Sequence, residues 1–284
     1  MSSTTAALQS RRAPARKAKA GGRTSRPAAG KADAASSPLF SYVVSLADDA
    51  LVLGHRLSEW TGYAPTLEED IALPNLALDL IGQARFFYAY AGEIEGKGRD
   101  EDALAYLRDE HGFSNVLLAE QPNGDFAATM LRQLLYAAFM HPYFQALTAS
   151  KDARLAEIAA KAVKEMAYHV RHSAEWVIRL GDGTEESRRR AAAALDELWM
   201  YTGELFEMGE GERALVGAGV AVDRESIRPA WDATINRVLA EATLERPAPC
   251  GMQSGGRAGR HTEYLGRMLA EMQVLHRAHP GVTW

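Results

Sequence analysis

The stretch from Lys161 to Leu180, KAVKEMAYHVRHSAEWVIRL, constrains the fold most strongly, because its apolar residues recur at the spacing of a helix. At about 100° per residue these side chains share one broad arc, and the lysines and arginines fall outside it. The arc, extended one turn toward the N-terminus, contains Ile158, Ala162, Met166, Val170, Val177 and Leu180. The pattern predicts a long amphipathic helix that packs against other helices.

This predicted helix also carries a possible remnant of a metal site. Glu165, His169 and His172 lie on or near its apolar arc. A glutamate and histidines on an inward face are how a four-helix bundle presents ligands to a di-iron centre. The alternative is an i,i+4 pair in which Glu165 satisfies a half-buried His169 without any metal. The helix alone leaves both interpretations open.

Helical periodicity recurs along most of the chain. We predict further helices over about 39–60, 66–94, 101–111, 126–150, 185–208, 227–244 and 263–276. The first two are long and joined by a few residues, which is typical of antiparallel neighbours in a bundle. No alternating strand pattern and no regular repeat is present. The sequence therefore predicts an all-α fold, a four-helix bundle with additional C-terminal helices.

Charge separates the first 38 residues from the rest. Residues 1–38 hold eight Lys or Arg and one acid, which leaves 24 basic and 36 acidic residues, a net charge of -12, for residues 39–284. We expect residues 1–38 to be a disordered basic tail, because they lack bulky apolar side chains. An organellar targeting segment and a polyanion contact are the alternatives. We expect residues 39–284 to form one helical domain that does not bind nucleic acid by bulk attraction.

Cysteine content and hydropathy bear on the compartment. Cys250 is the only cysteine, so the chain can form neither an internal disulfide nor a thiolate zinc cluster. This favours a reducing environment, and we expect a cytoplasmic protein. No run of about 18 apolar residues occurs, so we predict no membrane-spanning helix.

The metal ligands of a working centre are incomplete. A ferritin-like di-iron site needs a glutamate from each of two helices and a Glu-x-x-His motif from each of two others. No Asp or Glu in this chain is followed by His three residues later, and residues 126–150 contain no acid. Two Fe(II) ions would leave uncompensated charge in an apolar interior. We therefore predict that the chain binds no metal and retains a vestigial polar layer, formed by Asp49, Asp79, Gln83, Glu165 and His169. On the first helix we expect Asp49 at the edge of the inner face and Asp48 pointing away from it.

The glycine-rich basic segment SGGRAGRH, residues 254–261, is a separate candidate. Its backbone amides, with Arg257 and Arg260, could cradle a phosphate. A flexible loop is the alternative. Neither a dinucleotide-binding glycine motif, a P-loop nor a GxSxG motif is present.

Six segments resemble, in motif and order, the structural C subunits of bacterial ring 1,2-phenylacetyl-CoA epoxidases. They are DDALVLGHRLSEWTGYAP, EEDIALPNLALDLIGQARFF, RDEHGFSNVLLAEQPNGDFA, KEMAYHVRHSAEWVIRLGDGTEES, LDELWMYTGELFEM and GRAGRHTEYLGRMLAEMQ. The likeness covers about Leu39 to Trp284. It implies a ferritin-like, non-catalytic subunit that lost its metal centre and acts in aerobic phenylacetate degradation.

The resemblance also implies partners and contacts. In this family the subunit pairs with a homologous catalytic A subunit that holds a di-iron centre. A small B subunit and a reductase that uses NADPH, FAD and an iron–sulfur cluster complete a complex that epoxidises phenylacetyl-CoA with O2. The resemblance assigns substrate contacts to two segments, which are Gly112, Phe113, Ser114 and Asn115, and Glu212, Arg213 and Ala214.

Two other functions stay open on the residues alone. One is a divergent but active di-metal oxygenase in which Asp49, Asp79, Glu165 and His169 bind the ions. The other is a helical acyl-CoA-binding module without an oxygenase partner.

Overall fold

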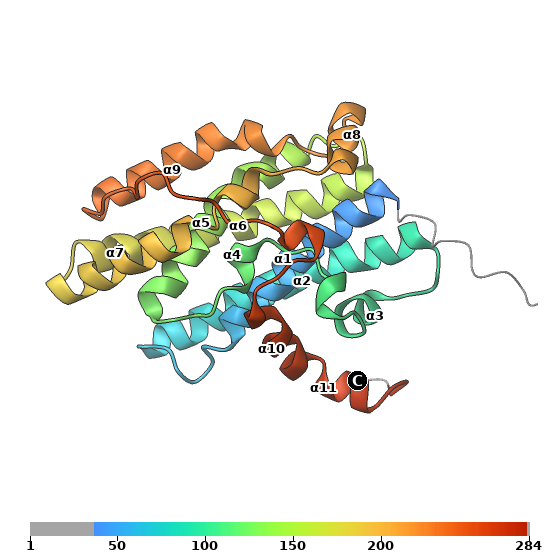
Figure 1. The fold of residues 1–284 in the computed structure, drawn as a ribbon, viewed down its shortest axis with the longest axis horizontal. Helices are drawn as coiled ribbons and strands as arrows, with labels where there is room; N and C mark the ends of the chain where they lie inside the picture. Colours follow the sequence, from blue (N-terminus) through green and yellow to red (C-terminus); the bar gives the residue numbers. More distant parts are fainter. Residues whose placement is uncertain (1–36, 283–284) are drawn as a thin grey trace, which may run out of the picture. The chain divides into compact units, whose positions relative to one another are not determined.

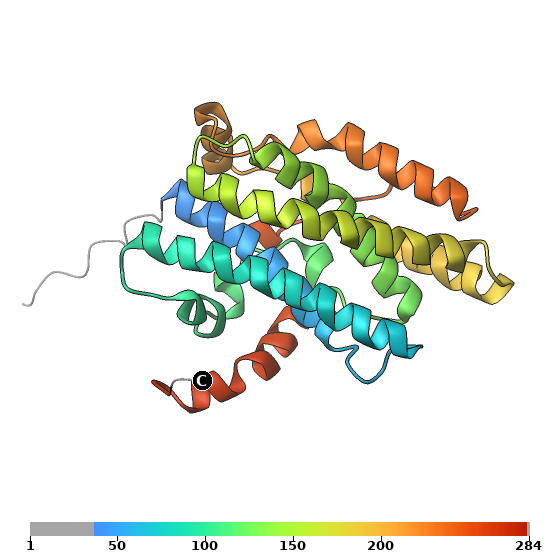
Figure 2. The ribbon, with the colours of Figure 1, turned by 180° about the vertical axis from the view of Figure 1, so that it is seen from behind.

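The computed structural model describes residues 37–282, and within this range every regular element is a helix (Figure 1). The longest helices are α1 (Pro38–Ser58), α2 (Leu67–Glu95), α5 (Phe126–Leu147) and α6 (Ala153–Gly181). α1 packs along α2 and α5 packs along α6, as Figures 1 and 2 show from opposite sides. The prediction of an all-α, ferritin-like bundle with additional C-terminal helices is confirmed.

The predicted basic tail, residues 1–38, lies outside the described residues except for its last two. Ser37 caps α1 by accepting a hydrogen bond from the Phe40 amide (3.1 Å), and Pro38 occupies the first turn. The first helix of the described residues therefore starts at the last residue of the predicted tail.

Side-chain caps set the starts of the long helices. Thr66 caps α2, Asp125 caps α5 and Thr184 caps α7 (Glu185–Trp199). In each case the side-chain oxygen accepts from the amide three residues later, which satisfies one of the free N–H groups of a helix start. Glu69 stands three residues after Thr66, where a capping box would place its carboxylate on the cap amide, but this carboxylate is instead buried against α6 and lies 2.9 Å from His172 Nε2.

Helix α5 lies at the centre of the domain. α6, α7 and α9 (Arg228–Glu241) pack on it, and it is buried along most of its length. Burial on several sides excludes charged residues that lack a partner. This explains why residues 126–150 carry no acid.

The shorter elements differ from the sequence-based boundaries. The helix expected over 185–208 ends at Trp199, and that expected over 101–111 is α3 (Glu101–Tyr106) followed by a short turn. Residues 209–226, where no helix was predicted, contain α8 (Glu210–Ala218), which ends at Gly219 in the left-handed conformation. The remaining α-helices are α4 (Leu117–Glu120), α10 (Glu263–Met272) and α11 (Val274–Ala278). Among the helices of residues 37–282, none is long and apolar enough to cross a membrane.

Candidate functional site

The predicted polar layer forms two hydrogen-bonded pairs between α2 and α6. Gln83 Nε2 donates to Glu165 Oε2 (2.8 Å), and His169 Nε2 lies 3.4 Å from Asp79 Oδ2. His169 is fully buried. The i,i+4 interpretation is not the arrangement observed, since each partner of the proposed pair bonds with another residue.

Gln133 on α5, which the sequence did not single out, completes this layer. Its Nε2 lies 2.9 Å from Nδ1 of His169. With the amide donating to Nδ1 and Nε2–H pointing at Asp79, a neutral imidazole satisfies both contacts. Within the described residues, no group of three or more His, Cys, Asp or Glu side chains is placed to hold a metal ion. The layer does not fit the ligand set of a di-iron centre, and the absence of a metal in this chain stays a prediction.

Asp49 belongs to a different network. Its carboxylate accepts from Arg257 Nη2 (2.6 Å) and from the Val116 amide (2.7 Å), and its side chain is almost fully buried. Burial raises the pKa of Asp49, and the charges of Arg257 and Arg224 offset this effect only in part. The structure therefore places Asp49 apart from the other four residues of the predicted layer.

The expectation that Asp48 points away from the core is wrong. Asp48 is fully buried and accepts from Tyr88 Oη (2.5 Å), from the Ser114 amide (2.7 Å) and from the guanidinium of Arg108. The physical reason is that α1 is covered on two sides. α2 packs on one side, and residues 112–117, which we call the Ser114 segment, pack on the other.

A cavity of about 330 Å³ lies where the start of α1, the Ser114 segment and the start of α8 meet. It brings together one residue from each of the two segments that the resemblance assigned to substrate, Ser114 and Glu212. The lining consists of Pro38, Ser41, Tyr42, Ser45, Ser114, Gly209, Gly211, Glu212 and Arg257. We call this space the α1–α8 cavity.

The other assigned residues lie outside its lining. Phe113 is buried with the Arg108 guanidinium 4.1 Å from its ring centroid, and Asn115 is buried and donates to Glu120. Gly112 offers its carbonyl to Arg108, and Arg213 and Ala214 are exposed on α8.

Glu212 is held in the wall of the cavity by a buried arginine. Arg224 is fully buried, and its Nε donates to Glu212 Oε1 (2.6 Å). Its guanidinium lies over the ring of Tyr143 (5.1 Å to the centroid), whose hydroxyl is 2.6 Å from that of Tyr42. Burial raises the pKa of Tyr143 to about 12, so this pair of hydroxyls is uncharged at neutral pH. Arg224 has no sequence signal of its own, because it lies in a connector rather than on a periodic helix.

Three consecutive carbonyls of the Ser114 segment receive hydrogen bonds from side chains. Gly112 O accepts from Arg108 Nη1 (2.7 Å), and Ser114 O accepts from Arg257 Nη1 (2.9 Å). His261 Nε2 lies 2.9 Å from Phe113 O. Arg108 on one side and two side chains from residues 257–261 on the other therefore fix the backbone of this segment.

Residues 253–262, which we call the strap, are packed on the domain. Both sequence interpretations of this glycine-rich stretch, a phosphate cradle and a flexible loop, are therefore wrong. The Gly255 amide donates to Glu204 Oε1 (2.8 Å), and Gly256 is buried against the Asn115 backbone. The Glu204 carboxylate thus takes the Gly255 amide, and the Gly259 amide donates to the Gly256 carbonyl. Arg257 is paired with Asp49, while Arg260 is exposed.

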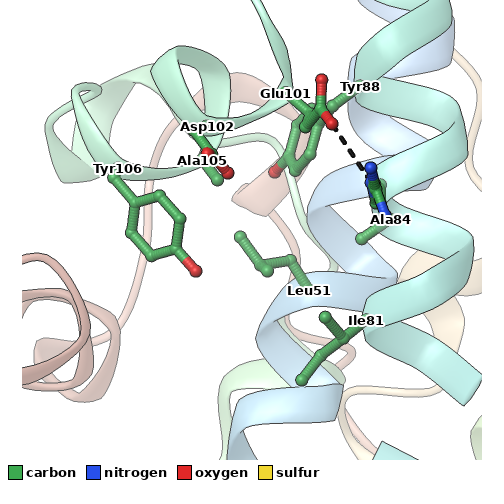
Figure 3. Close-up of a pocket in the computed structure, with 9 residues that line it drawn as sticks. Leu51, Ile81, Ala84, Tyr88, Glu101, Asp102, Ala105 and Tyr106 are labelled. Carbon is green, nitrogen blue, oxygen red and sulfur yellow. Dashed lines mark hydrogen bonds and ion pairs between the residues drawn. The ribbon is translucent and has the colours of Figure 1, made fainter. Parts of the chain in front are cut away.

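A second cavity, of about 290 Å³, lies between α1, α2 and α3 (Figure 3). An ion pair between Arg85 and Glu101 (3.1 Å) stands at its edge, and Tyr88 links it to the buried Asp48. Its remaining lining is mostly apolar, and it contains none of the residues singled out from the sequence.

The fold and its interior define a class: a ferritin-like helical bundle in which side chains bond to one another at the positions where ligands are expected. The sequence profile of the phenylacetic acid catabolic protein family matches residues 21–284, so the chain belongs to this family. It is 50% identical over 246 residues to the C subunit of 1,2-phenylacetyl-CoA epoxidase from Escherichia coli (strain K12), a match that covers 87% of this chain and 99% of that protein. The family resemblance noted from the sequence is confirmed.

Proposed function

We propose that this chain is the structural C-type subunit of a 1,2-phenylacetyl-CoA epoxidase that acts in aerobic phenylacetate degradation. The observation that carries the proposal is the 50% identity to the Escherichia coli protein over 99% of its length. The family membership over residues 21–284 supports it.

The proposed role is non-catalytic and requires partners. The hydrogen-bonded pairs Gln83–Glu165 and Asp79–His169 leave no set of anionic ligands for two iron ions. The proposal therefore places the di-iron centre on a homologous catalytic A subunit. A small B subunit and a reductase with FAD and an iron–sulfur cluster, which takes electrons from NADPH, complete the complex. We expect a cytoplasmic location, as the cysteine content suggests.

The α1–α8 cavity is the proposed contact with the acyl-CoA substrate. Arg257 is already tied to Asp49 and to the Ser114 carbonyl, and Ser114 Oγ donates to Asp48. Ser45 Oγ donates to a backbone carbonyl. The lining thus presents mainly acceptors, including the carboxylate of Glu212. Acceptors suit the hydroxyl and amide N–H groups of a pantetheine chain better than a phosphate.

An exposed apolar stripe on α2 is the proposed contact with a partner subunit. Leu67, Ile71 and Leu78 are 71%, 57% and 65% exposed. Their spacing of four and seven residues places them on one face of the helix. An apolar helix face left in water favours association with another protein surface.

The test is a reconstituted complex with variants of Glu212. Glu212→Gln removes the charge but keeps an acceptor for Arg224. We expect it to raise the KM for phenylacetyl-CoA several-fold with little change in kcat, because it weakens binding rather than the reaction step. Glu210→Gln, at the exposed start of the same helix, is the matched control and should leave KM unchanged. An unchanged KM in the Glu212 variant would exclude the cavity as the substrate contact, and a chain that neither joins nor supports the complex would exclude the proposed role.

A further inference from the structure

We propose that His261, as an imidazolium, is a positioning residue that holds the Ser114 segment in place beside the α1–α8 cavity. We call the contacts of His261 with Glu120 and with the Phe113 carbonyl the tie. The tie is a property of this chain alone. Its effect on substrate binding rests on the proposed function.

The two ring nitrogens of His261 both face acceptors. Nδ1 lies 2.8 Å from Glu120 Oε2, and Nε2 lies 2.9 Å from the carbonyl oxygen of Phe113. A neutral imidazole carries one N–H and one lone pair, so it can make only one of these bonds and must turn a lone pair toward the other oxygen. The doubly protonated ring makes both. The side chain is 3% exposed, so water is a poor substitute for either partner.

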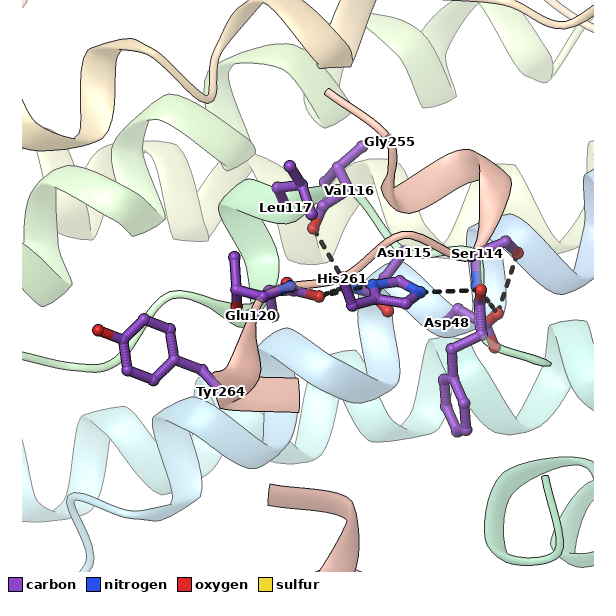
Figure 4. A network of polar contacts seen from close by, with 12 residues as sticks. Asp48, Ser114, Asn115, Val116, Leu117, Glu120, Gly255, His261 and Tyr264 are labelled. Atoms are coloured by element: carbon purple, nitrogen blue, oxygen red, sulfur yellow. Dashed lines mark hydrogen bonds and ion pairs between the residues drawn. The ribbon is translucent and has the colours of Figure 1, made fainter. Parts of the chain in front are cut away.

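The other partners of Glu120 indicate an ionised carboxylate. Glu120 is fully buried, and it also accepts from the Thr262 amide (2.6 Å) and from Asn115 Nδ2 (2.9 Å). Figure 4 shows Glu120, on α4, beside Asn115 of the Ser114 segment and His261 of the strap. An acceptor with three donors is best satisfied without a proton of its own. The geometry is that of a buried ion pair.

The charges around the ring act in both directions. Asp48 on α1 adds negative potential but is paired with Arg108, and Arg56 on α1 donates to the backbone carbonyl of Glu120. Burial by itself lowers the pKa of His261. The hydrogen bonds to Glu120 and to the Phe113 carbonyl, with the charges of Glu120 and Asp48, outweigh burial and raise this pKa above its ordinary value.

The tie acts on the cavity through one peptide unit. Phe113 directly precedes Ser114, which lines the cavity, and Arg257 holds the Ser114 carbonyl on the other side. A neutral ring keeps its one N–H on Nδ1, because a hydrogen bond to the carboxylate of Glu120 is stronger than one to a neutral carbonyl. The Phe113 carbonyl then loses its partner, which removes one of these two fixed points and leaves a buried carbonyl unpaired at a cost. The segment should then sample other positions, and the wall of the cavity should lose its shape.

The first experiment reads the ring directly, without substrate or partners. The purified chain is labelled with ¹⁵N-histidine, and the spectrum of His261→Gln identifies the signals of His261. Both ring nitrogens should carry protons at neutral pH, and the ring should titrate above the ordinary value of about 6.5. A neutral tautomer at neutral pH would overturn the proposal.

The second experiment measures amide hydrogen exchange in the Ser114 segment. The amides of Ser114, Val116 and Leu117 donate to buried carboxylates and are protected only while the segment is in place. His261→Gln should make them exchange at least several-fold faster. His141→Gln, on α5, is the matched control and should change nothing there. Equal exchange in the His261 variant and the wild type would contradict the tie.

The third experiment uses Glu120→Gln to keep the tie without the charge. Gln Nε2 can donate to Nδ1 of a neutral ring, whose Nε2–H still reaches Phe113. The Asn115 amide can flip to offer its unpartnered Oδ1 to the new N–H. The protection of the amides of the Ser114 segment, relative to their intrinsic exchange rate at each pH, should fall in the wild type as pH rises through the pKa of His261. In Glu120→Gln the protection should show no such step. A step that persists in this variant would refute a role for the imidazolium.

The same variants in the reconstituted complex test the consequence for substrate. The wild-type KM for phenylacetyl-CoA should rise several-fold with the deprotonation of His261. The KM of His261→Gln should be high at every pH. In both proteins kcat should change little. A wild-type complex that turns over substrate without this step would overturn the positioning role. A complex that shows no turnover would instead count against the proposed function, and the spectra and exchange rates would still decide on the tie.

Discussion

Four buried carboxylates satisfy the backbone and side chains of one short stretch of the chain. Residues 114–117 make no strand pairing in the described structure, so their buried polar groups need other partners. Each residue is paired with a different carboxylate, two of them consecutive on α1. The pairs are Ser114 with Asp48, Asn115 with Glu120, Val116 with Asp49 and Leu117 with Glu204. The acids of the interior thus position a loop.

The first prediction concerns the cation that balances Asp48. Arg108→Ala leaves this fully buried carboxylate without its charge partner and frees the Gly112 carbonyl. We expect a loss of about 3–5 kcal/mol in the free energy of unfolding, which is the usual cost of breaking a buried pair by removing one partner. Denaturant unfolding of the isolated chain measures it. Arg154→Ala breaks only an exposed pair with Glu157 and should leave the midpoint unchanged; equal midpoints for both variants would show that Asp48 is not buried as described.

The second prediction concerns the pH dependence of stability at His261. Because its pKa is raised in the folded chain, the pair with Glu120 contributes fully below the unfolded value of about 6.5 and is lost as pH rises through the folded pKa. His261→Gln should therefore destabilise the chain most in mildly acidic solution and least in alkaline solution. Thermal unfolding against pH checks the slope. His141→Gln should show the reverse slope, because burial lowers the pKa of His141.

Periodicity could not have revealed this part of the site. A helical pattern assumes one buried face, and α1 has two, since the Ser114 segment covers Asp48. Arg224 and Glu120 likewise gain their roles from partners far away in the chain. By contrast, Ser114 and Glu212 were singled out only by the family resemblance, because the two segments share no local pattern. Their contact with substrate stays a prediction.

At the scale of the elements, local chemistry predicted the long helices well. The caps at Thr66, Asp125 and Thr184 and the periodicity of α6 are properties of a few neighbouring residues. The strap was misjudged because its glycines were read as flexibility. Gly256 instead allows close packing, since a Cβ at this position would lie 2.1 Å from the Asn115 carbonyl oxygen. A glycine needed for close approach and a glycine in a flexible loop look the same in a sequence.

This close approach gives a third prediction. Gly256→Ala should push the strap away from the Ser114 segment and destabilise the chain by about 1–3 kcal/mol, the usual cost of overpacking. Gly251→Ala is the control, because a Cβ there meets nothing within 4 Å. Differential scanning calorimetry of both variants measures the effect. If the two melt together, the strap is not packed on the segment.

The apolar stripe on α2 gives a fourth prediction at the same scale. Leu78→Glu places a charge in the proposed partner contact and should weaken association with the catalytic subunit at least tenfold. The isolated chain should keep its stability, because Leu78 is 65% exposed. Leu107→Glu, at a residue 54% exposed beyond the end of α3, is the matched control. Analytical ultracentrifugation of the mixed subunits measures the association. Retained binding in the Leu78 variant would place the contact elsewhere.

At the scale of the whole molecule, the bundle has a ferritin-like fold, and hydrogen bonds hold together the polar layer between its long helices. An imidazole, two amides and two carboxylates from α2, α5 and α6 already bond to one another. A metal ion entering this layer would have to break those bonds, and it would gain too few anionic ligands to balance its charge. The composition of α5 also disfavours a metal site, because a carboxylate introduced on this helix would be buried among apolar neighbours.

This argument gives the last prediction. We expect the chain purified alone to retain far less than one iron per chain after exposure to Fe(II) without oxygen. In its complex with the catalytic subunit, the iron should be found on the catalytic subunit. His169→Ala should lower the stability of the chain, because it leaves Gln133 and Asp79 without their shared partner, yet it should not change the iron content of the complex. Metal analysis of each separated subunit makes the distinction. Two irons per chain in the isolated protein, lost in the His169 variant, would instead establish a working di-metal oxygenase.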